Sequence, residues 1–307
     1  MKTTLITGGL GFIGSNICEL LLKKKYTDKC ILVDNFGGYM NPIKDGFIDF
    51  RKQRFSSLKN IVIERCDTSN YKALSSILNK YKPDYIYHTA ALPLAKVSNL
   101  NNEEAKISSV DSTLNIIDAI NFMKNSNKNF KFERFIYFSS SMVYGDFKKP
   151  VVNEKSEKNP KDAYGIMKLA GEVVTEGLCK LHNIPYTIIR PSAVYGPKDM
   201  NRRVSQIFIE SAFQNKEIYI QGKNEKLDFT YIKDLANGSI LAARSKKGIN
   251  EIFNITCGKG QTLLSYVIYL KRKFPNIKYV VKARDKTKPS RGTLSINKAK
   301  RLLGYKP

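Results

Sequence analysis

A tyrosine and a lysine spaced four residues apart are the residues of this chain best suited to acid–base chemistry. Tyr164 and Lys168 would lie one turn apart on the same face of a helix. A phenol with an ordinary pKa of about 10 is a poor base at neutral pH, but a neighbouring positive charge favours the phenolate. The same spacing also occurs in a solvated pair on a helix surface, so the pair needs support from other residues.

A serine run supplies a hydroxyl that could work with this tyrosine. Ser140 is the middle of three consecutive serines that directly follow the apolar segment Arg134–Phe138. If that segment is a strand of a parallel sheet, its carboxyl end faces the crevice where ligands bind. A hydroxyl there can share a proton with Tyr164 and hold a substrate hydroxyl. Alternatively, the serine run is only a polar turn without a catalytic role.

A glycine-rich segment predicts a dinucleotide site. Residues 7–14 read Thr-Gly-Gly-Leu-Gly-Phe-Ile-Gly and stand between an apolar segment and an amphipathic one. Such glycines let the backbone turn tightly and approach a pyrophosphate at a helix N-terminus. Asp34 ends the next apolar segment, 20 residues after Gly14, where a carboxylate binds ribose hydroxyls and repels a 2′-phosphate. The expected cofactor is therefore NAD, whose nicotinamide ring would supply a second positive charge beside Tyr164.

Short apolar runs alternate with amphipathic stretches, which predicts a parallel sheet covered by helices. We expect a Rossmann-type, doubly wound α/β domain over residues 1–190 and a smaller, mostly substrate-binding domain over 191–307, with a strand near 251–255 returning to the main sheet. The expected strands are Thr3–Thr7, Cys30–Asp34, Ile61–Glu64, Tyr85–His88, Arg134–Phe138, Pro185–Arg190 and Ile252–Ile255. The expected helices are Ser15–Lys25, Tyr71–Tyr81, Ser109–Lys124 and Ala163–His182.

Composition excludes several classes of protein. No stretch approaches the roughly 20 apolar residues of a membrane span, and the N-terminus offers no secretory signal, so a cytoplasmic location is expected. The five cysteines form no CxxC pair and there are only two histidines, so we expect no metal site. A formal charge of +25 would suit a phosphate-rich partner, but the lysines are spread along the chain, which favours a solubilising surface over nucleic-acid binding.

Together these motifs resemble the extended short-chain dehydrogenase/reductase superfamily, in particular its NAD-dependent epimerase/dehydratase family, which includes UDP-glucose 4-epimerase. The resemblance covers nearly the whole chain. It rests on the glycine loop, the serine run, the Tyr164 and Lys168 pair, His88-Thr89-Ala90-Ala91, and the segments 190–197, 227–234 and 291–292. It implies a nucleotide-sugar substrate, tightly held NAD, and a homodimer packed through helices that include Ala163–His182.

The resemblance also implies the site residues. The expected catalytic set is Ser140, Tyr164 and Lys168. The expected NAD-binding residues are Gly8, Gly11, Phe12, Ile13, Gly14, Asp34, Asn35, Asp67, Thr68, Ala90, Ala91, Tyr164, Lys168, Pro191 and Val194. The expected substrate-binding residues are Ser141, Met142, Arg203 and Arg291. Asp67-Thr68 could equally be a helix cap, Arg291 could be simply exposed, and His88 is expected to be a satisfied buried residue.

Departures from the family pattern bear on the substrate. Ala193 and Leu227 stand where epimerases often carry Asn and Arg, Ser109 replaces a familiar Asn, and Pro93 stands where UDP-galactose epimerases have a lysine. Ser141 and Met142 fall where sugar dehydratases carry acidic residues. Because neither side chain can act as a carboxylate acid or base, dehydration is disfavoured.

The preferred hypothesis is oxidation at carbon 4 of a nucleotide sugar, followed by return of the hydride to the other face, which is epimerisation. The alternative is a net 4-dehydrogenase that releases the keto sugar, for example from a GDP- or UDP-sugar destined for surface polysaccharide. A third hypothesis, from another class, is a non-catalytic NAD- or RNA-binding protein of the same fold. The expected partners are a nucleotide sugar and a second copy of the chain, with neither nucleic acid nor membrane.

Overall fold

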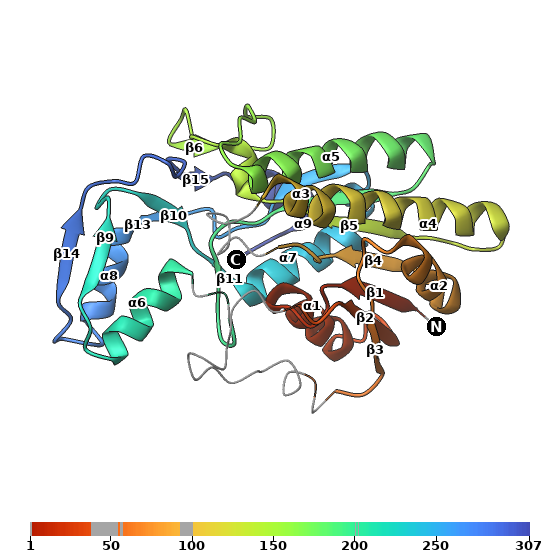
Figure 1. The fold of residues 1–307 in the computed structure, drawn as a ribbon, viewed down its shortest axis with the longest axis horizontal. Coiled ribbons are helices and arrows are strands. Elements are labelled where there is room, and N and C mark those ends of the chain that lie inside the picture. The colour runs from red at the N-terminus through yellow and green to blue at the C-terminus, as the bar shows by residue number, and fades with distance from the viewer. Residues whose placement is uncertain (1, 38–54, 56–57, 93–100, 200, 202) are drawn as a thin grey trace.

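The computed structural model describes residues 2–37, 55, 58–92, 101–199, 201 and 203–307. Its centre is a seven-stranded parallel sheet in the order β12-β7-β5-β4-β1-β2-β3 (Figure 1). The strands are β1 (Thr3–Thr7), β2 (Lys29–Asp34), β3 (Ile61–Arg65), β4 (Tyr85–His88), β5 (Arg134–Phe138), β7 (Tyr186–Arg190) and β12 (Glu251–Asn254). The direction of strand succession reverses between β1 and β4, so the ligand crevice of a doubly wound sheet opens there. The expected fold class is confirmed.

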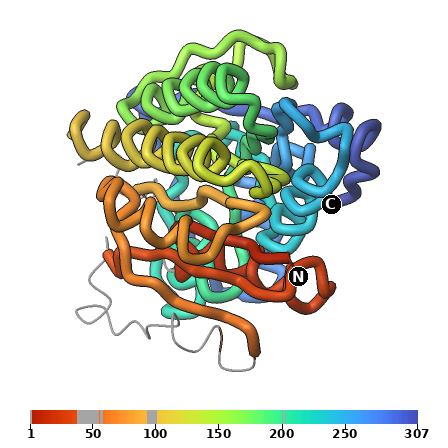
Figure 2. The backbone as a smooth tube through the Cα atoms, turned by 90° about the vertical axis from the view of Figure 1, so that its right-hand side faces the viewer, coloured from red at the N-terminus to blue at the C-terminus, as the bar shows by residue number. Residues whose placement is uncertain are grey.

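Helices cover both faces of this sheet and give it two separate apolar cores. On one face α1 (Phe12–Lys23), α7 (Ile232–Arg244) and α9 (Asn297–Leu303) pack with the sheet around residues such as Ile17 and Ile240. On the other face lie α2 (Tyr71–Tyr81), α4 (Ser112–Ser126) and α5 (Ala163–Leu181). Figures 1 and 2 show α4 and α5 side by side.

One expected helix is differently built. Ser109 was expected to begin a regular helix, but it lies within the π-helical turn Ile107–Asp111, between α3 (Asn102–Lys106) and α4. The turn contacts α5, and π-helical turns within helices often occur at functional sites. Local periodicity predicts helix here without revealing the extra residue in the turn.

A second lobe is attached where β7 and β12 end. It contains α6 (Val204–Phe213), α8 (Leu263–Lys271) and the paired strands β9 (Ile218–Gln221) with β14 (Tyr279–Lys282), and β10 (Lys226–Asp228) with β13 (Gly260–Thr262). Its own apolar core includes Phe208, Ile220 and Val267. Two short strand pairs lie between the lobes: β8 (Val194–Tyr195) pairs with β11 (Thr230–Tyr231), and β6 (Val151–Val152) pairs with β15 (Thr293–Leu294). The turns η4 (Ser141–Tyr144) and η5 (Lys246–Gly248) complete the described elements. None of the described helices is long and apolar enough to cross a membrane.

Helix α5 approaches β5 closely because a glycine stands at the crossing. A Cβ added at Gly171 would lie 2.1 Å from the hydroxyl oxygen of Tyr137 and 2.9 Å from the carbonyl oxygen of Ser109. The Tyr137 hydroxyl donates to the carbonyl oxygen of Lys168 at 3.3 Å. The absence of a side chain at Gly171 therefore sets the distance between α5 and the sheet.

Gly171→Ala should destabilise the protein. Elsewhere in a helix this change gains about 0.5–1 kcal/mol, but here the added methyl group must displace Tyr137, and overpacking of this kind typically costs about 1–3 kcal/mol. In a Tyr137→Phe background the cost should shrink because the nearest contacting atom is gone. Urea unfolding of the four proteins of this double-mutant cycle measures the coupling. An equal cost in both backgrounds would contradict the packing described.

Candidate active site

The structure brings the three expected catalytic residues together at the carboxyl end of β5. The ammonium nitrogen of Lys168 donates to the carbonyl oxygen of Phe138 at 2.8 Å and lies 5.9 Å from the centre of the Tyr164 ring. The Ser140 hydroxyl lies close enough to the Tyr164 phenol to lower its pKa. It also accepts the backbone N–H of Met142 at 3.1 Å. The roles predicted for these residues are therefore geometrically compatible.

Local backbone geometry explains why these side chains meet. Asp162 caps α5 by accepting the backbone N–H of Gly165 at 2.7 Å, so the helix begins at Ala163, directly before Tyr164. The turn that follows Ser140 ends at Gly145, which has a φ of +63° and leaves no room for a Cβ beside the carbonyl oxygen of Asn159. This close approach holds the serine turn against the segment that leads into α5.

Burial shifts both catalytic pKa values. Burial lowers the pKa of Lys168 to about 7, against the charge of Glu172, which raises it. Burial also raises the pKa of Tyr164, while the Arg203 guanidinium and the Ser140 hydroxyl lower it and Asp162 raises it. The sequence argument expected Lys168 to acidify the phenol. In the structure Arg203, from the second lobe, also lowers the Tyr164 pKa, and the net shift is upward because burial outweighs it. The effect of Lys168 on the phenol stays a prediction.

His88 is confirmed as a satisfied buried residue. Its Nδ1 lies 2.7 Å from the Thr7 hydroxyl and its Nε2 lies 3.2 Å from the Ser112 hydroxyl. Burial and the nearby Lys168 charge lower its pKa to about 3. The imidazole is therefore neutral at physiological pH and links β1, β4 and α4.

The glycine loop forms a backbone cradle. Gly8 has a φ of +64°, and a Cβ there would lie 2.8 Å from the Cα of Ala90. At Gly14 a Cβ would lie 2.5 Å from the carbonyl oxygen of Gly8. The first turn of α1 carries no acidic residue, and helix N-termini favour anions. This loop fits a pyrophosphate as the sequence predicts.

Asp34 stands beside that cradle. Its carboxylate accepts the backbone N–H of Leu10 at 3.1 Å and that of Phe36 at 2.9 Å. The Asn35 amide donates to the Asp67 carboxylate at 3.0 Å. These contacts align the carboxyl ends of β2 and β3 along one edge, where a ribose and an adenine would follow the pyrophosphate.

Asp67 does not cap α2. Its carboxylate accepts the N–H and hydroxyl of Ser69, and the cap is Asn70, which accepts the N–H of Ala73 at 3.1 Å. Burial works against ionisation of Asp67, but the hydrogen bonds from Asn35 and Ser69 outweigh it and lower the pKa. The cap alternative considered for Asp67 is thus wrong, and cofactor binding stays a prediction for it and for the buried Thr68.

The other residues expected at the NAD site lie along the same edge or beneath it. Phe12, Pro191 and Val194 are buried, Gly11 is exposed, and Ile13, Ala90 and Ala91 are partly exposed. The Pro191 carbonyl oxygen accepts the N–H of Ser141 at 2.9 Å, so the segment after β7 is fixed to the serine turn. Pro93 and Arg202 lie outside the described residues.

Two arginines of the second lobe lie in each other's electrostatic field, and one of them, Arg203, also acts on the catalytic tyrosine. The Arg203 Nε is buried and has no hydrogen-bond partner among the described residues. Burial lowers the pKa of Arg291 to about 10, opposed by Glu225 and Asp162 and reinforced by the Arg203 charge. Two guanidiniums this close to each other form a positively charged site, the arginine corner, that is suited to binding an anion. Ser141 and Met142, also expected to bind substrate, are only 2% and 6% exposed.

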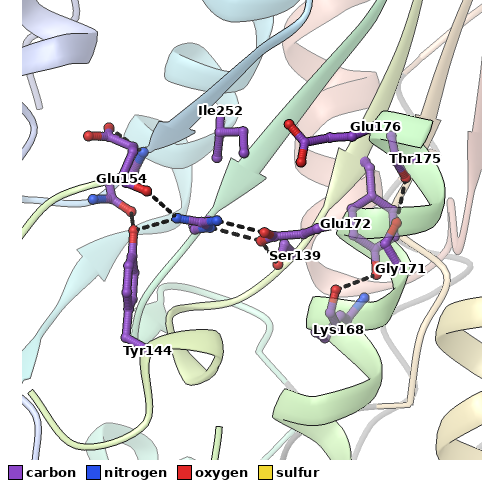
Figure 3. Close-up of polar contacts among 12 residues, drawn as sticks. Ser139, Tyr144, Glu154, Lys168, Gly171, Glu172, Thr175, Glu176 and Ile252 are labelled. Carbon is purple, nitrogen blue, oxygen red and sulfur yellow. Dashed lines mark hydrogen bonds and ion pairs between the residues drawn. The ribbon is translucent and has the colours of Figure 1, made fainter. Parts of the chain in front are cut away.

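Sequence reasoning missed a buried ion pair behind the site. The Arg190 guanidinium donates to the two Glu172 carboxylate oxygens at 2.8 and 2.6 Å, and both side chains are almost fully buried. Arg190 also donates to the Tyr144 hydroxyl at 2.8 Å. Figure 3 shows Tyr144, Glu154, Ser139 and Glu172 gathered at this point. The available signal was Glu172 itself, one helical turn beyond Lys168 on the same face of α5.

The doubly wound sheet, the glycine cradle and the serine, tyrosine and lysine at its carboxyl edge define an extended short-chain dehydrogenase/reductase. Residues 4–256 match the NAD dependent epimerase/dehydratase family, so the chain belongs to that family and NAD is its cofactor.

Relatives agree over nearly the whole chain. A Bacillus subtilis (strain 168) protein described as an uncharacterized UDP-glucose epimerase YtcB is 30% identical, over 99% of this chain and 92% of that protein. The UDP-glucuronic acid 4-epimerase of Bacillus cereus, solved with UDP-glucuronic acid and NAD, is 28% identical with a TM-score of 0.84, covering 99% of this chain and 94% of that one. The UDP-glucose 4-epimerase of Thermotoga maritima, solved with UDP-glucose, is 26% identical with a TM-score of 0.85, covering 99% and 93%.

Asp34→Asn should weaken the preference for NAD over NADP. The amide no longer repels a 2′-phosphate and binds ribose hydroxyls less strongly, so the ratio of the two dissociation constants should fall by about tenfold or more, equivalent to about 1.4 kcal/mol. Fluorescence titration with NADH and NADPH measures the ratio. Asp28→Asn is the matched control, because that carboxylate binds the N–H of Lys2 before β1, at the amino end of the sheet. Unchanged discrimination in Asp34→Asn would refute the role.

Proposed function

We propose that this protein is a nucleotide-sugar epimerase that works through reversible oxidation at the sugar C4 hydroxyl. The observation that carries the proposal is the meeting of Ser140, Tyr164 and Lys168 beside the dinucleotide cradle. The relatives named as 4-epimerases support it. NAD, when bound in that cradle, would supply the acceptor and donor of the C4 hydride.

Each catalytic side chain then has one task. Tyr164 takes the C4 hydroxyl proton, directly or through Ser140, and later returns it. Ser140 holds the reacting hydroxyl, since its own hydroxyl faces the phenol and lowers the pKa of Tyr164. Lys168, anchored to the Phe138 carbonyl oxygen by one N–H, has further N–H groups for the nicotinamide ribose.

Substrate binding falls to the second lobe. We assign residues 191–307 mostly to this task, with Arg203 and Arg291 binding the diphosphate because guanidiniums pair well with phosphate oxygens. Ser141 and Met142 flank the site without offering a carboxylate. This supports epimerisation over dehydration, which needs an acid and a base beside the sugar.

The cysteines support a cytoplasmic location within this proposal. All five are free, and four of them are buried. Reducing compartments keep thiols in this state, whereas exported proteins more often pair them. The cytoplasm is thus the compartment we propose for the reaction.

Tyr164→Phe should lower kcat by at least about 10²-fold, the usual contribution of a general base, while NAD stays bound. Turnover is followed by chromatography of UDP-glucose, UDP-glucuronate and their C4 epimers, with NAD content measured after denaturation. Tyr71→Phe, at the exposed start of α2, is the control and should keep full activity. Because the phenol must ionise to act as a base, Tyr164 should limit the acid limb of the wild-type kcat profile.

The same assay separates epimerisation from net oxidation. An epimerase needs no added oxidant and shows no lasting absorbance at 340 nm, whereas a 4-dehydrogenase accumulates NADH. Near-normal turnover in Tyr164→Phe would refute the mechanism. No turnover of any nucleotide sugar by the wild-type protein would refute the proposed function.

We also propose a homodimer formed by α4 and α5. The two helices lie side by side, and both carry large apolar side chains that are exposed. The most exposed of these are Phe122 at 55%, Val173 at 63% and Leu181 at 69%. Contiguous apolar patches of this kind mark interaction surfaces, and two pairs of such helices would bury them in a four-helix bundle.

Val173→Glu should convert the dimer to a monomer, since the symmetric contact would bury two unpaired carboxylates. Light scattering coupled to size-exclusion chromatography measures the molar mass. Phe213→Glu is the control, because Phe213 is 73% exposed on α6 in the other lobe, and this variant should remain dimeric. A monomeric wild-type protein, or a dimeric Val173→Glu variant, would overturn the assignment.

A further inference from the structure

Three consecutive residues at the carboxyl end of β5 each face a different turn of α5. The Phe138 carbonyl oxygen accepts from Lys168 at 2.8 Å. The Ser139 hydroxyl donates to the Glu172 carboxylate at 2.5 Å, and the Ser140 hydroxyl lies close enough to Tyr164 to lower the pKa of the phenol. Figure 3 shows Ser139 close to Glu172, with Lys168 one turn away on the same helix. The catalytic serine is therefore preceded by two residues already tied to the catalytic helix.

Glu172 is itself held from the opposite side. Arg190, at the end of β7, binds both its carboxylate oxygens and is anchored in turn by the Tyr144 hydroxyl and the Glu154 carbonyl oxygen, at 2.8 and 3.1 Å. Tyr144 donates onward to the Asn254 side chain of β12 at 2.8 Å. Glu172 thus has little freedom to move, and it transmits the position of β7 and β12 to α5.

The side-chain bond at Ser139 connects the serine turn to α5, a connection that the backbone bonds of the sheet do not make. The N–H of Ser139 donates to the Ile189 carbonyl oxygen at 2.8 Å, and the N–H of Ser141 donates to that of Pro191 at 2.9 Å. These backbone bonds tie the serine turn to β7 alone. The bond to Glu172 ties it to α5, the element that carries Tyr164.

We propose that Glu172 is a positioning residue for the reaction: held by Arg190, it fixes Ser139 and thereby sets the Ser140 hydroxyl against the Tyr164 phenol. The inference rests on the proposed function. A misplacement of about 1 Å can cost on the order of 10²-fold in rate, so a single bond beside the catalytic serine is enough to matter. Glu172 touches neither substrate nor cofactor in this role.

Glu172 also contributes the anion that faces Lys168. The other groups around that ammonium are the rings of Tyr137 and Tyr164, at 5.1 and 5.9 Å, and the imidazole of His88. Burial raises the pKa of both tyrosines and lowers that of His88 to about 3, so all three are neutral near pH 7. Glu172 is the group that opposes the effect of burial on the Lys168 pKa.

Ser139→Ala tests the positioning bond, because it removes one hydroxyl and leaves the ion pair intact. We expect kcat to fall about tenfold or more, with KM and NAD affinity unchanged. Thr175→Val is the matched control: Thr175 is equally buried on α5, but its hydroxyl binds only the Gly171 carbonyl oxygen of its own helix. Equal kcat in the two variants would overturn the proposal.

Glu172→Gln tests the charge. Because the ammonium of Lys168 is lost as pH rises through its pKa, removing the anion should move the alkaline limb of the kcat profile to lower pH, by at least about half a unit. Ser139→Ala should leave that limb in place. A structural defect shared by the two variants would instead affect the pH profile of both in the same way. An unshifted limb in a folded Glu172→Gln enzyme would overturn the electrostatic part.

If Glu172→Gln does not fold, Ser139→Ala still decides the positioning part. Absence of wild-type turnover on every nucleotide sugar refutes the proposed function instead, and is distinguishable from both results.

Discussion

The crossing of α5 over the carboxyl end of β5 is the constraint on which the rest of the site depends. Gly171 allows the approach, and the buried pair of Glu172 and Arg190 fixes its register. Burying two charges is costly, and their attraction offsets that cost only where hydrogen bonds satisfy the remaining donors and acceptors. Here Ser139, Tyr144 and the Glu154 carbonyl oxygen supply them. A network built this way specifies one geometry more than it adds stability.

The second lobe is joined to the sheet by another buried carboxylate. Asp228, at the end of β10, accepts the N–H groups of Gly258 and Leu294 and the Thr256 hydroxyl, each at 3.2 Å. Burial raises its pKa despite these bonds. The segment that it holds lies three residues beyond Arg291. The arginine corner of the site is thus fixed through hydrogen bonds to one side chain at the junction between the lobes.

The sequence predicted those parts of the molecule that depend on local pattern. The buried strands are short apolar runs, and the glycine loop needs its residue types for steric reasons that hold in any context, as at Gly8 and Gly14. The ion pair between Glu172 and Arg190 joins residues 18 positions apart through a helix and a strand, and no local periodicity encodes it. The same holds for the π-helical turn at Ser109, which depends on packing against α5.

Arg203 shows most clearly what pattern alone could not supply. The sequence places a cation next to Tyr164 through the helical spacing of Lys168, and the structure has the two side chains close together. It adds a second cation, Arg203, whose charge lowers the pKa of the phenol. Lys168 is bound to a carbonyl oxygen and has its own pKa lowered by burial, whereas Arg203 comes from the second lobe.

The acidity of Tyr164 therefore depends on how the two lobes sit around a substrate, since a diphosphate that drew Arg203 away would weaken its effect on the phenol. With no carboxylate at positions 141 and 142, the proton path that the described residues offer runs through Ser140 and Tyr164. A site with one reversible proton path and one hydride acceptor is suited to oxidising a carbinol and reducing it again.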